Sequence, residues 1–95
     1  MPAAAGLVVN PSPDIDYEDI NMPHINIKHL PTELDERRES ALVSEITQAV
    51  KSAFGVDEGV ISITLESVAP EVWHEQVYVP EIVNRRELLR KVPQY

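Results

Sequence analysis

The chain lacks cysteine altogether and has only three glycines and one tryptophan among its 95 residues. Without cysteine it can form neither a disulfide nor a thiolate metal site. Three scattered glycines cannot make the glycine-rich loop that holds phosphate groups. These absences exclude several large enzyme classes, so any chemistry must come from other side chains.

Basic residues are also scarce, with eight Lys and Arg against sixteen Asp and Glu and a formal net charge of −8. Binding to a phosphate backbone needs clustered cations, so no nucleic-acid partner is expected. No apolar run approaches a membrane span, and the opening "MPAAAGLVV" lacks the positively charged start of a signal peptide. The sequence therefore predicts a cytoplasmic protein without a membrane partner.

Residues 1–22 differ in composition from the rest of the chain. They contain no basic residue but hold three prolines and four acids: Pro2, Pro11, Pro13, Asp14, Asp16, Glu18 and Asp19. A segment of this kind buries too little apolar surface to offset the entropy of ordering it. We therefore expect an N-terminal extension over 1–22 and one folded domain over 23–95.

The first half of that domain has two clear periodicities. "PHINIKHL" alternates apolar and polar residues as a strand does, and Pro23 fits only at its first position because proline cannot donate to a ladder. A helix follows, capped by Thr32 or Asp35 and ended by Gly55. Its apolar stripe consists of Leu42, Ile46, Ala49, Val50, Ala53 and Phe54. "VISITLESV" alternates again, which predicts a parallel, right-handed β-α-β unit.

The last third of the chain is less regular. Pro70 could begin a short helical turn, and "VYV" (77–79) suggests a third, short strand. "PEIVNRRELLRKV" (80–92) predicts a second helix with Pro80 in its first turn. The fold class is thus α/β (α+β): a two-stranded parallel sheet, a main helix and a C-terminal helix.

The predicted strands and helices leave much apolar surface uncovered. Parallel sheets are almost always buried on both faces, and a domain of about seventy residues has a small core. We expect the sheet to be completed by oligomerisation, in a homodimer whose two sheets pack together. The apolar residues of the second helix, Ile82, Val83, Leu88 and Leu89, add to this expectation.

The histidines do not form a metal site. His24 and His29 are five residues apart on one strand and so point to opposite faces, and His74 stands alone. We expect structural roles for all three and neither a metal nor a cofactor.

Pro23 is a candidate catalytic base, because it stands at the start of a strand directly after a methionine. If translation began at Met22, removal of that methionine would leave a proline amine at the start of a strand. An α-amino group titrates at about 8 in water, and burial lowers that pKa, which gives a neutral base near pH 7. The alternative from these residues alone is a proline that merely opens a strand.

"MPHINIKHLPTELDERRESALVSEITQAVKSAFGV" followed by "ISITLESVAPEVW" closely resembles the 4-oxalocrotonate tautomerase family, and most of all its bacterial PptA-type branch. The resemblance covers Met22 to Tyr95, including the tail "RKVPQY". It implies a β-α-β building block, Pro23 as acid/base, and keto–enol isomerisation without a cofactor. PptA-type members are dimers, whereas the founding enzymes are hexamers. Trp73 falls near the family's aromatic pocket wall, although a loop aromatic that anchors the core is an equal alternative.

The chain departs from the founding members at two places. They have an arginine before the main helix and another in the second strand, whereas "LPTELDE" and "GVISITLE" contain none. The resemblance then implies a less charged or aromatic substrate, with His24 or backbone N–H groups replacing part of the arginine's role. Lys28, Arg85 and Arg86 are the remaining cations that could meet a carboxylate, and each is also explained as a solvated surface charge.

Two functions follow. The first is a tautomerase acting on a small enol or keto acid, such as a phenylenolpyruvate-like acid or a 2-hydroxydienoate, and weak or inactive while residues 1–22 block Pro23. The alternative is a non-catalytic oligomeric interaction module on the same scaffold. In that case the extension, with Tyr17 and its carboxylates, masks the pocket.

Overall fold

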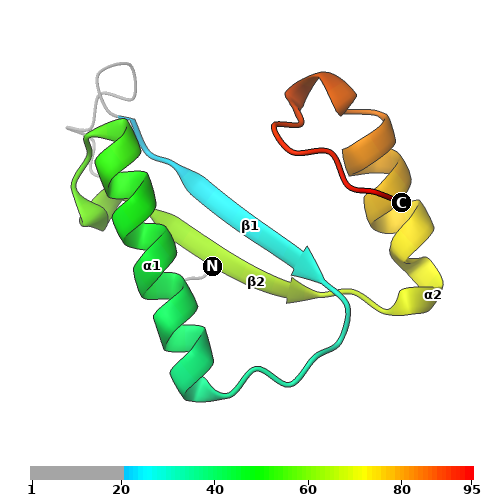
Figure 1. The fold of residues 1–95 in the computed structure, drawn as a ribbon, viewed down its shortest axis with the longest axis horizontal. Helices are drawn as coiled ribbons and strands as arrows, with labels where there is room; N and C mark the ends of the chain where they lie inside the picture. Colours follow the sequence, from blue (N-terminus) through cyan, green and yellow to red (C-terminus); the bar gives the residue numbers. More distant parts are fainter. Residues whose placement is uncertain (1–20) are drawn as a thin grey trace, which may run out of the picture.

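The computed structural model describes residues 21–95 of the chain. The predicted extension therefore lies almost wholly outside the described residues, and its boundary with the domain stays a prediction. A strand, a long helix and a second strand form one body. A C-terminal arm, residues 70–95, which is mainly helical, follows at the far end of the sheet (Figure 1).

The two strands confirm the predicted parallel pairing. β1 (His24–His29) lies beside β2 (Ser62–Ser67), with Ile25 opposite Ile63 and Ile27 opposite Leu65. Because both strands run in the same direction, the residues that begin them lie side by side at one end of the sheet. A short 3₁₀ turn, η1 (Glu58–Val60), leads into β2.

The main helix, α1 (Glu36–Phe54), has the predicted limits. Asp35, not Thr32, is its N-cap, because the Asp35 side chain accepts a hydrogen bond from the Arg38 N–H at 2.8 Å. Gly55 ends the helix in the left-handed region at φ 66°, and its N–H donates to the Lys51 carbonyl at 2.9 Å. This conformation favours glycine, which explains the abrupt end of the helix.

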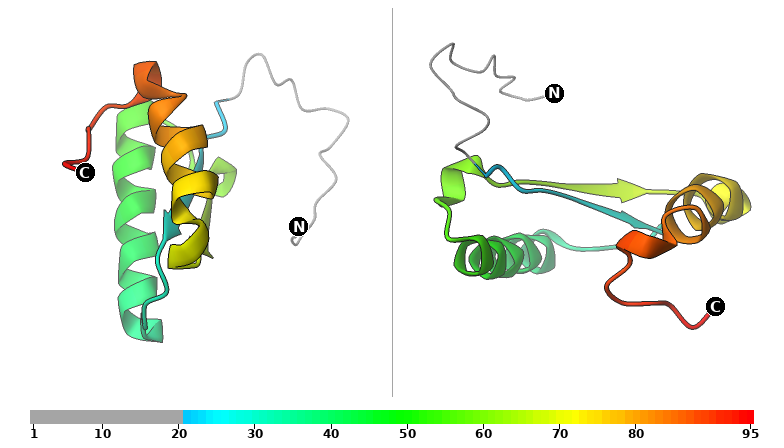
Figure 2. Two further views of the ribbon diagram at one scale, coloured as in Figure 1. Left: turned by 90° about the vertical axis from the view of Figure 1, so that its right-hand side faces the viewer. Right: turned by 90° about the horizontal axis from the view of Figure 1, so that it is seen from above.

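α1 lies along one side of the two strands, and no helix or strand of residues 21–95 lies along the other side (Figure 2). The apolar residues of the strands are half-buried: Ile25, Ile27, Ile63 and Leu65. The half-buried residues of α1 are Leu42, Val43, Ile46, Thr47 and Val50. Phe54, at the end of the predicted stripe, remains 55% exposed. The helix therefore has more apolar surface than two strands can cover.

The C-terminal arm corrects two predictions. α2 (Pro70–Trp73) continues without a break into a wider π-helix, η2 (His74–Val83), and a 3₁₀ turn, η3 (Arg86–Leu88), follows. The predicted strand over 77–79 is wrong, because these residues lie inside η2. The helix predicted over 80–92 is also wrong, since η2 runs through Pro80 and ends at Val83, and only the η3 turn follows. Three apolar residues in a row do not distinguish a strand from a buried helical turn, and Val77 is buried, with 6% exposure.

Pro80 lies inside η2, although proline normally disrupts the interior of an α-helix. It lacks the N–H that would bond to a preceding carbonyl, and its ring crowds the carbonyl four residues back in an α-helix. In the wider helix, hydrogen bonds reach five residues back, as from the Asn84 N–H to the Val79 carbonyl at 2.9 Å.

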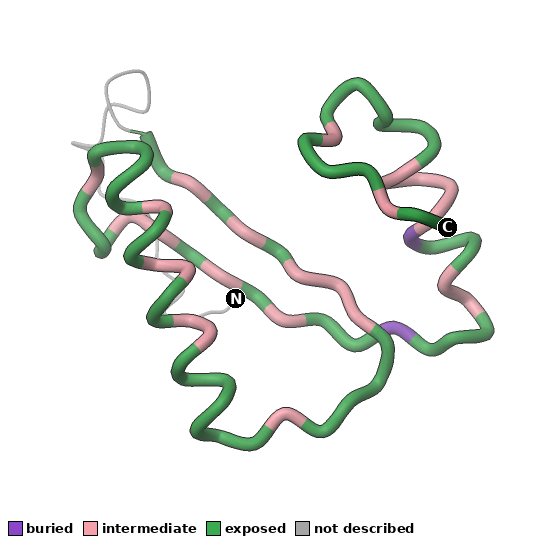
Figure 3. The backbone as a smooth tube through the Cα atoms, in the orientation of Figure 1, coloured by how far each residue is buried: buried purple, intermediate pink, exposed green. Residues whose placement is uncertain are grey.

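Little of the described chain is buried (Figure 3). Val68 and Val77 are the buried apolar residues of this part of the chain, and none of its large side chains is fully enclosed. Among residues 21–95, no helix combines the length and the apolar character needed to cross a membrane.

Candidate active site

Pro23 immediately precedes β1 and is half-buried. Its carbonyl accepts a hydrogen bond from the Ser62 N–H at 3.2 Å, which fixes the residue at the edge where both strands begin. Met22 precedes it and is exposed, with 39% of its surface accessible. While Met22 is attached, the Pro23 nitrogen is a tertiary amide without a proton or a basic lone pair.

His24 follows Pro23 and is exposed on the face of the sheet away from the isoleucines. Its Nδ1 lies 2.7 Å from the Ser62 hydroxyl, 38 positions away in sequence. The strand register places Ser62 directly opposite His24. The imidazole is therefore held through one nitrogen next to the candidate base.

The same face continues as a row of polar side chains between the strands. Asn26 accepts a hydrogen bond from the Thr64 hydroxyl and donates to a Glu66 carboxylate oxygen at 3.2 Å. These contacts make the uncovered face hydrogen-bonded and polar, unlike the apolar face toward α1. A partner that covers it would meet polar groups.

Lys28 closes this row at the end of β1 that is nearest the arm. Its ammonium donates to the Glu81 carboxylate of η2 in a part-buried ion pair. The Glu81 hydrogen bond raises the pKa of Lys28, and the charges of Glu81 and Glu66 add to this effect, whereas desolvation opposes it. Lys28 is therefore engaged in holding the arm to the sheet and does not face Pro23.

Trp73 ends α2 and is half-buried. It follows the carboxyl end of β2, whereas Pro23 precedes the amino end of β1 (Figure 1). Since six residues of strand span about 20 Å, one chain does not bring these two predicted site residues together. The exposed Arg85 and Arg86 also belong to the arm, beyond the same end of the sheet.

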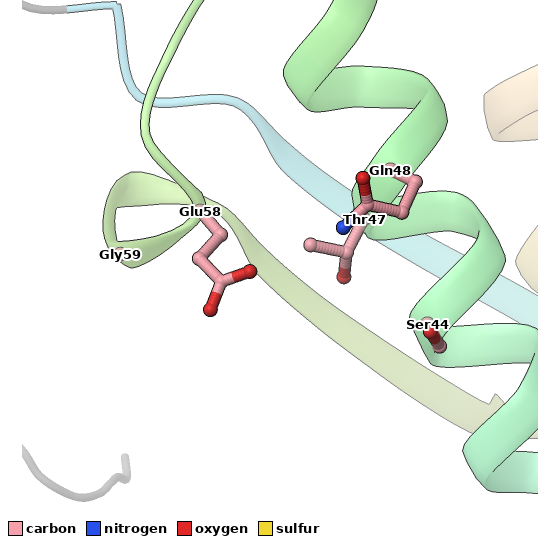
Figure 4. Close-up of a pocket in the computed structure, with 5 residues that line it drawn as sticks. All are labelled: Ser44, Thr47, Gln48, Glu58 and Gly59. Carbon is pink, nitrogen blue, oxygen red and sulfur yellow. The ribbon is translucent and has the colours of Figure 1, made fainter.

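A hollow of about 360 Å³ lies between α1 and the η1 turn (Figure 4). It is lined by Ser44, Thr47, Gln48, Glu58 and Gly59. Neither Pro23 nor Trp73 lines it, and Glu58 is its only ionisable side chain. It does not have the composition of the site that the sequence predicts.

No pattern in the sequence marks Ser62 or Glu81 as a functional residue. The strand register places Ser62 opposite His24, and this register is a property of the paired strands, not of either segment alone. Glu81 likewise had no signal, since its contact with Lys28 depends on the helix that replaced the predicted strand.

No protein-family model matches the chain. It is similar to curated proteins named Tautomerase PptA. The one from Escherichia coli O127:H6 is 39% identical over 74 residues, which are 78% of this chain and 97% of the relative. Those from Cronobacter sakazakii and Pectobacterium carotovorum are 34% and 31% identical over the same shares.

The β-α-β unit with its two-stranded parallel sheet is consistent with the tautomerase fold. The chain belongs to the tautomerase family, in the branch like 4-oxalocrotonate tautomerase, and these relatives confirm the resemblance seen in the sequence.

Proposed function

We propose that this protein is a cofactor-independent keto–enol tautomerase whose acid/base is the amine of Pro23. The observation that supports this most is the place of Pro23. It lies immediately before β1, at the end of the sheet where both strands begin, and its carbonyl accepts a hydrogen bond from the Ser62 N–H. The chain belongs to the tautomerase family.

The reaction needs one group that accepts a proton and returns it. The free Pro23 amine, neutral near pH 7, removes the proton from the enol hydroxyl as the carbonyl forms. The resulting Pro23 ammonium then gives a proton to the carbon of the former double bond. No electrons are exchanged with a cofactor, and the base is regenerated.

The substrate class follows from the groups near Pro23. We expect a phenylenolpyruvate-like acid or a 2-hydroxydienoate, because the positions of both family arginines lack a cation and Lys28 is paired with Glu81. His24 is the side chain next to Pro23 that can donate a hydrogen bond to a substrate oxygen. An aromatic or conjugated substrate would gain binding energy from apolar contacts instead of from a bidentate arginine.

The active unit is a homodimer in this proposal. The described chain buries little apolar surface, and several large apolar residues of the arm remain exposed: Val83, Leu88, Val92 and Tyr95. Trp73 can form a wall beside Pro23 only if it comes from a second copy. Dimerisation would therefore both cover apolar surface and complete the site.

In this proposal, residues 1–22 determine whether the nitrogen of Pro23 is an amide or a free amine. With these residues attached, Pro23 has no amine, so the 95-residue chain is expected to be nearly inactive. A chain that starts at Met22 has 74 residues, the length that makes up 97% of the Escherichia coli relative. Removal of Met22 from this chain exposes the proline.

The test compares the two chain lengths. Met22–Tyr95 is expressed, a proline terminus is verified by mass spectrometry, and the ketonisation of phenylenolpyruvate and 2-hydroxymuconate is followed by absorbance. The short chain should be active and the 95-residue chain nearly inactive. If Pro23→Ala leaves the rate of the short chain unchanged, the mechanism is wrong.

A non-catalytic interaction module is the second candidate. The amide-blocked Pro23 and the missing arginines favour it, and residues 1–22 would then mask the pocket. It predicts that both chain lengths lack activity and that a protein partner is recovered by affinity capture. Activity that appears only in the short chain excludes it.

A further inference from the structure

Ser62 contacts both residues that start the domain. Its backbone N–H donates to the Pro23 carbonyl at 3.2 Å, and its hydroxyl lies 2.7 Å from Nδ1 of His24. The first contact belongs to the sheet, whereas the second depends on the serine side chain. One residue of β2 therefore fixes both the backbone of the candidate base and the ring beside it.

The backbone of Ser62 is positioned by hydrogen bonds of the turn that precedes β2. The η1 turn is closed by a hydrogen bond from the Gly59 N–H to the Asp57 carboxylate at 3.0 Å, and another from the Ile61 N–H to the Glu58 carbonyl at 3.1 Å. The chain then enters β2 directly at Ser62. These contacts of the turn, together with the hydrogen bond from the Ser62 N–H to the Pro23 carbonyl, place the Ser62 hydroxyl opposite His24.

The contact occupies Nδ1 of His24 and leaves Nε2 as the other hydrogen-bonding atom of the ring. The roles of the two nitrogens depend on the tautomer. When the Ser62 hydroxyl donates to Nδ1, the neutral ring has its hydrogen on Nε2, which is then a donor; when the hydroxyl accepts from Nδ1–H of the neutral ring, Nε2 is an acceptor. The tautomer in which Ser62 donates is the one that offers a donor to a substrate.

We infer that Ser62 is a positioning residue: it holds His24 through Nδ1 so that Nε2–H donates to the substrate oxygen that becomes negatively charged. This inference rests on the proposed function and names the group that takes over charge stabilisation from an arginine. No proton leaves His24 in this step. The enol proton goes to the Pro23 nitrogen, and the hydrogen bond from Nε2 stabilises the charge that remains on oxygen.

The test uses the Met22–Tyr95 chain with a proline terminus. Ser62→Ala should lower kcat by roughly tenfold, the effect of one such hydrogen bond, with a smaller change in KM. Ser62→Thr keeps a hydroxyl and should retain most of the activity. Ser67→Ala removes a hydroxyl from the other end of β2, opposite His29, and should leave kcat unchanged.

A double-mutant cycle separates positioning from a purely structural role. If Ser62 acts through His24, Ser62→Ala has no further effect on kcat in a chain that already has His24→Ala. Equal losses in both backgrounds overturn the inference. Urea unfolding of each variant shows whether a loss of activity is a loss of folded protein, and Ser62→Thr tests the hydroxyl in a folded chain.

The two proposals fail differently. Full activity in Ser62→Ala, together with a large loss in Pro23→Ala, overturns the role of Ser62 alone. Full activity in Pro23→Ala overturns the proposed function.

Discussion

Lys28 and Glu81 are 53 positions apart in the chain and form an ion pair that joins β1 to the helical arm. The pair links the two parts of the described structure, which otherwise meet where β2 leads into α2. The arm presents Trp73 and most of the exposed apolar residues. Its position relative to the sheet therefore affects both the proposed dimer and the proposed site.

The Lys28–Glu81 ion pair should make the stability of the protein depend on pH in a defined way. Lys28 has a pKa raised above its usual 10.5, mainly by its hydrogen bond with Glu81. A raised pKa in the folded state stabilises the protein below the unfolded pKa, and this contribution disappears as pH rises through the folded value. Glu81→Gln should therefore lower Tm at pH 8 but have little effect at strongly alkaline pH.

The measurement is thermal unfolding of both proteins from pH 8 to pH 11 at low salt. Glu75→Gln is the matched control, because Glu75 lies in the same helix and has no ion pair within residues 21–95. A Tm difference for Glu81→Gln that persists unchanged above the pKa of Lys28 contradicts the assignment.

The cap of α1 gives a second prediction. Asp35→Ala removes the acceptor of the Arg38 N–H and should lower the free energy of unfolding by about 1 kcal/mol. Asp35→Ser restores an acceptor and should recover most of that loss. Thr32→Ala serves as the control, since Thr32 was the rival cap in the sequence and should change stability little. Urea unfolding at one fixed protein concentration measures all three.

Gly55 gives a third prediction, because only its backbone conformation constrains it. A Cβ built at this position meets no atom within 4 Å, yet φ is 66°. Gly55→Ala should therefore cost about 1 kcal/mol through the left-handed backbone alone. Gly55→Asn should cost less, since asparagine tolerates this region better. Equal losses for the two variants in urea unfolding would indicate a steric cause instead.

The separation of Trp73 from Pro23 predicts complementation between subunits. In a two-fold dimer, each site would combine Pro23 of one chain with Trp73 of the other. Mixing inactive Pro23→Ala chains with Trp73→Ala chains, both starting at Met22, then restores about one quarter of the normal activity, because half of the dimers have one intact site.

The subunits are mixed by unfolding and refolding in urea, and the parent variants refolded separately are the controls. Light scattering at micromolar concentration should show a dimer throughout. Activity that stays at the sum of the two parents means that Trp73 and Pro23 do not act across an interface. A hexamer would place the chain with the founding branch of the family.

Local sequence patterns were sufficient for the β-α-β unit. Alternation of Ile25 and Ile27 with polar residues, the stripe of α1 and the single glycine at its end each depend on neighbours a few residues away. The structure confirms all three and resolves the cap in favour of Asp35. Pro23 could be singled out for the same reason, since its place at the head of a strand is a local feature.

The arm could not be predicted in this way. The residues at 77–79 have no periodicity long enough to separate strand from helix, and Pro80 is compatible with a helix start as well as with a widened interior. The contacts of Lys28 with Glu81 and of His24 with Ser62 join residues far apart in sequence. They depend on register and on helix placement, which no short window of sequence contains.

Pro23 is held in place through its carbonyl, which accepts a hydrogen bond from the Ser62 N–H, whereas its proposed reactivity belongs to its nitrogen. The carbonyl end of the residue is held to the sheet by a hydrogen bond to which residues 1–22 contribute no atom. The nitrogen end alone is changed when the preceding residues are removed. Cutting the chain there would convert an inert amide into an amine at a place the fold has already fixed, so no rearrangement of the strands is needed to switch the chemistry on.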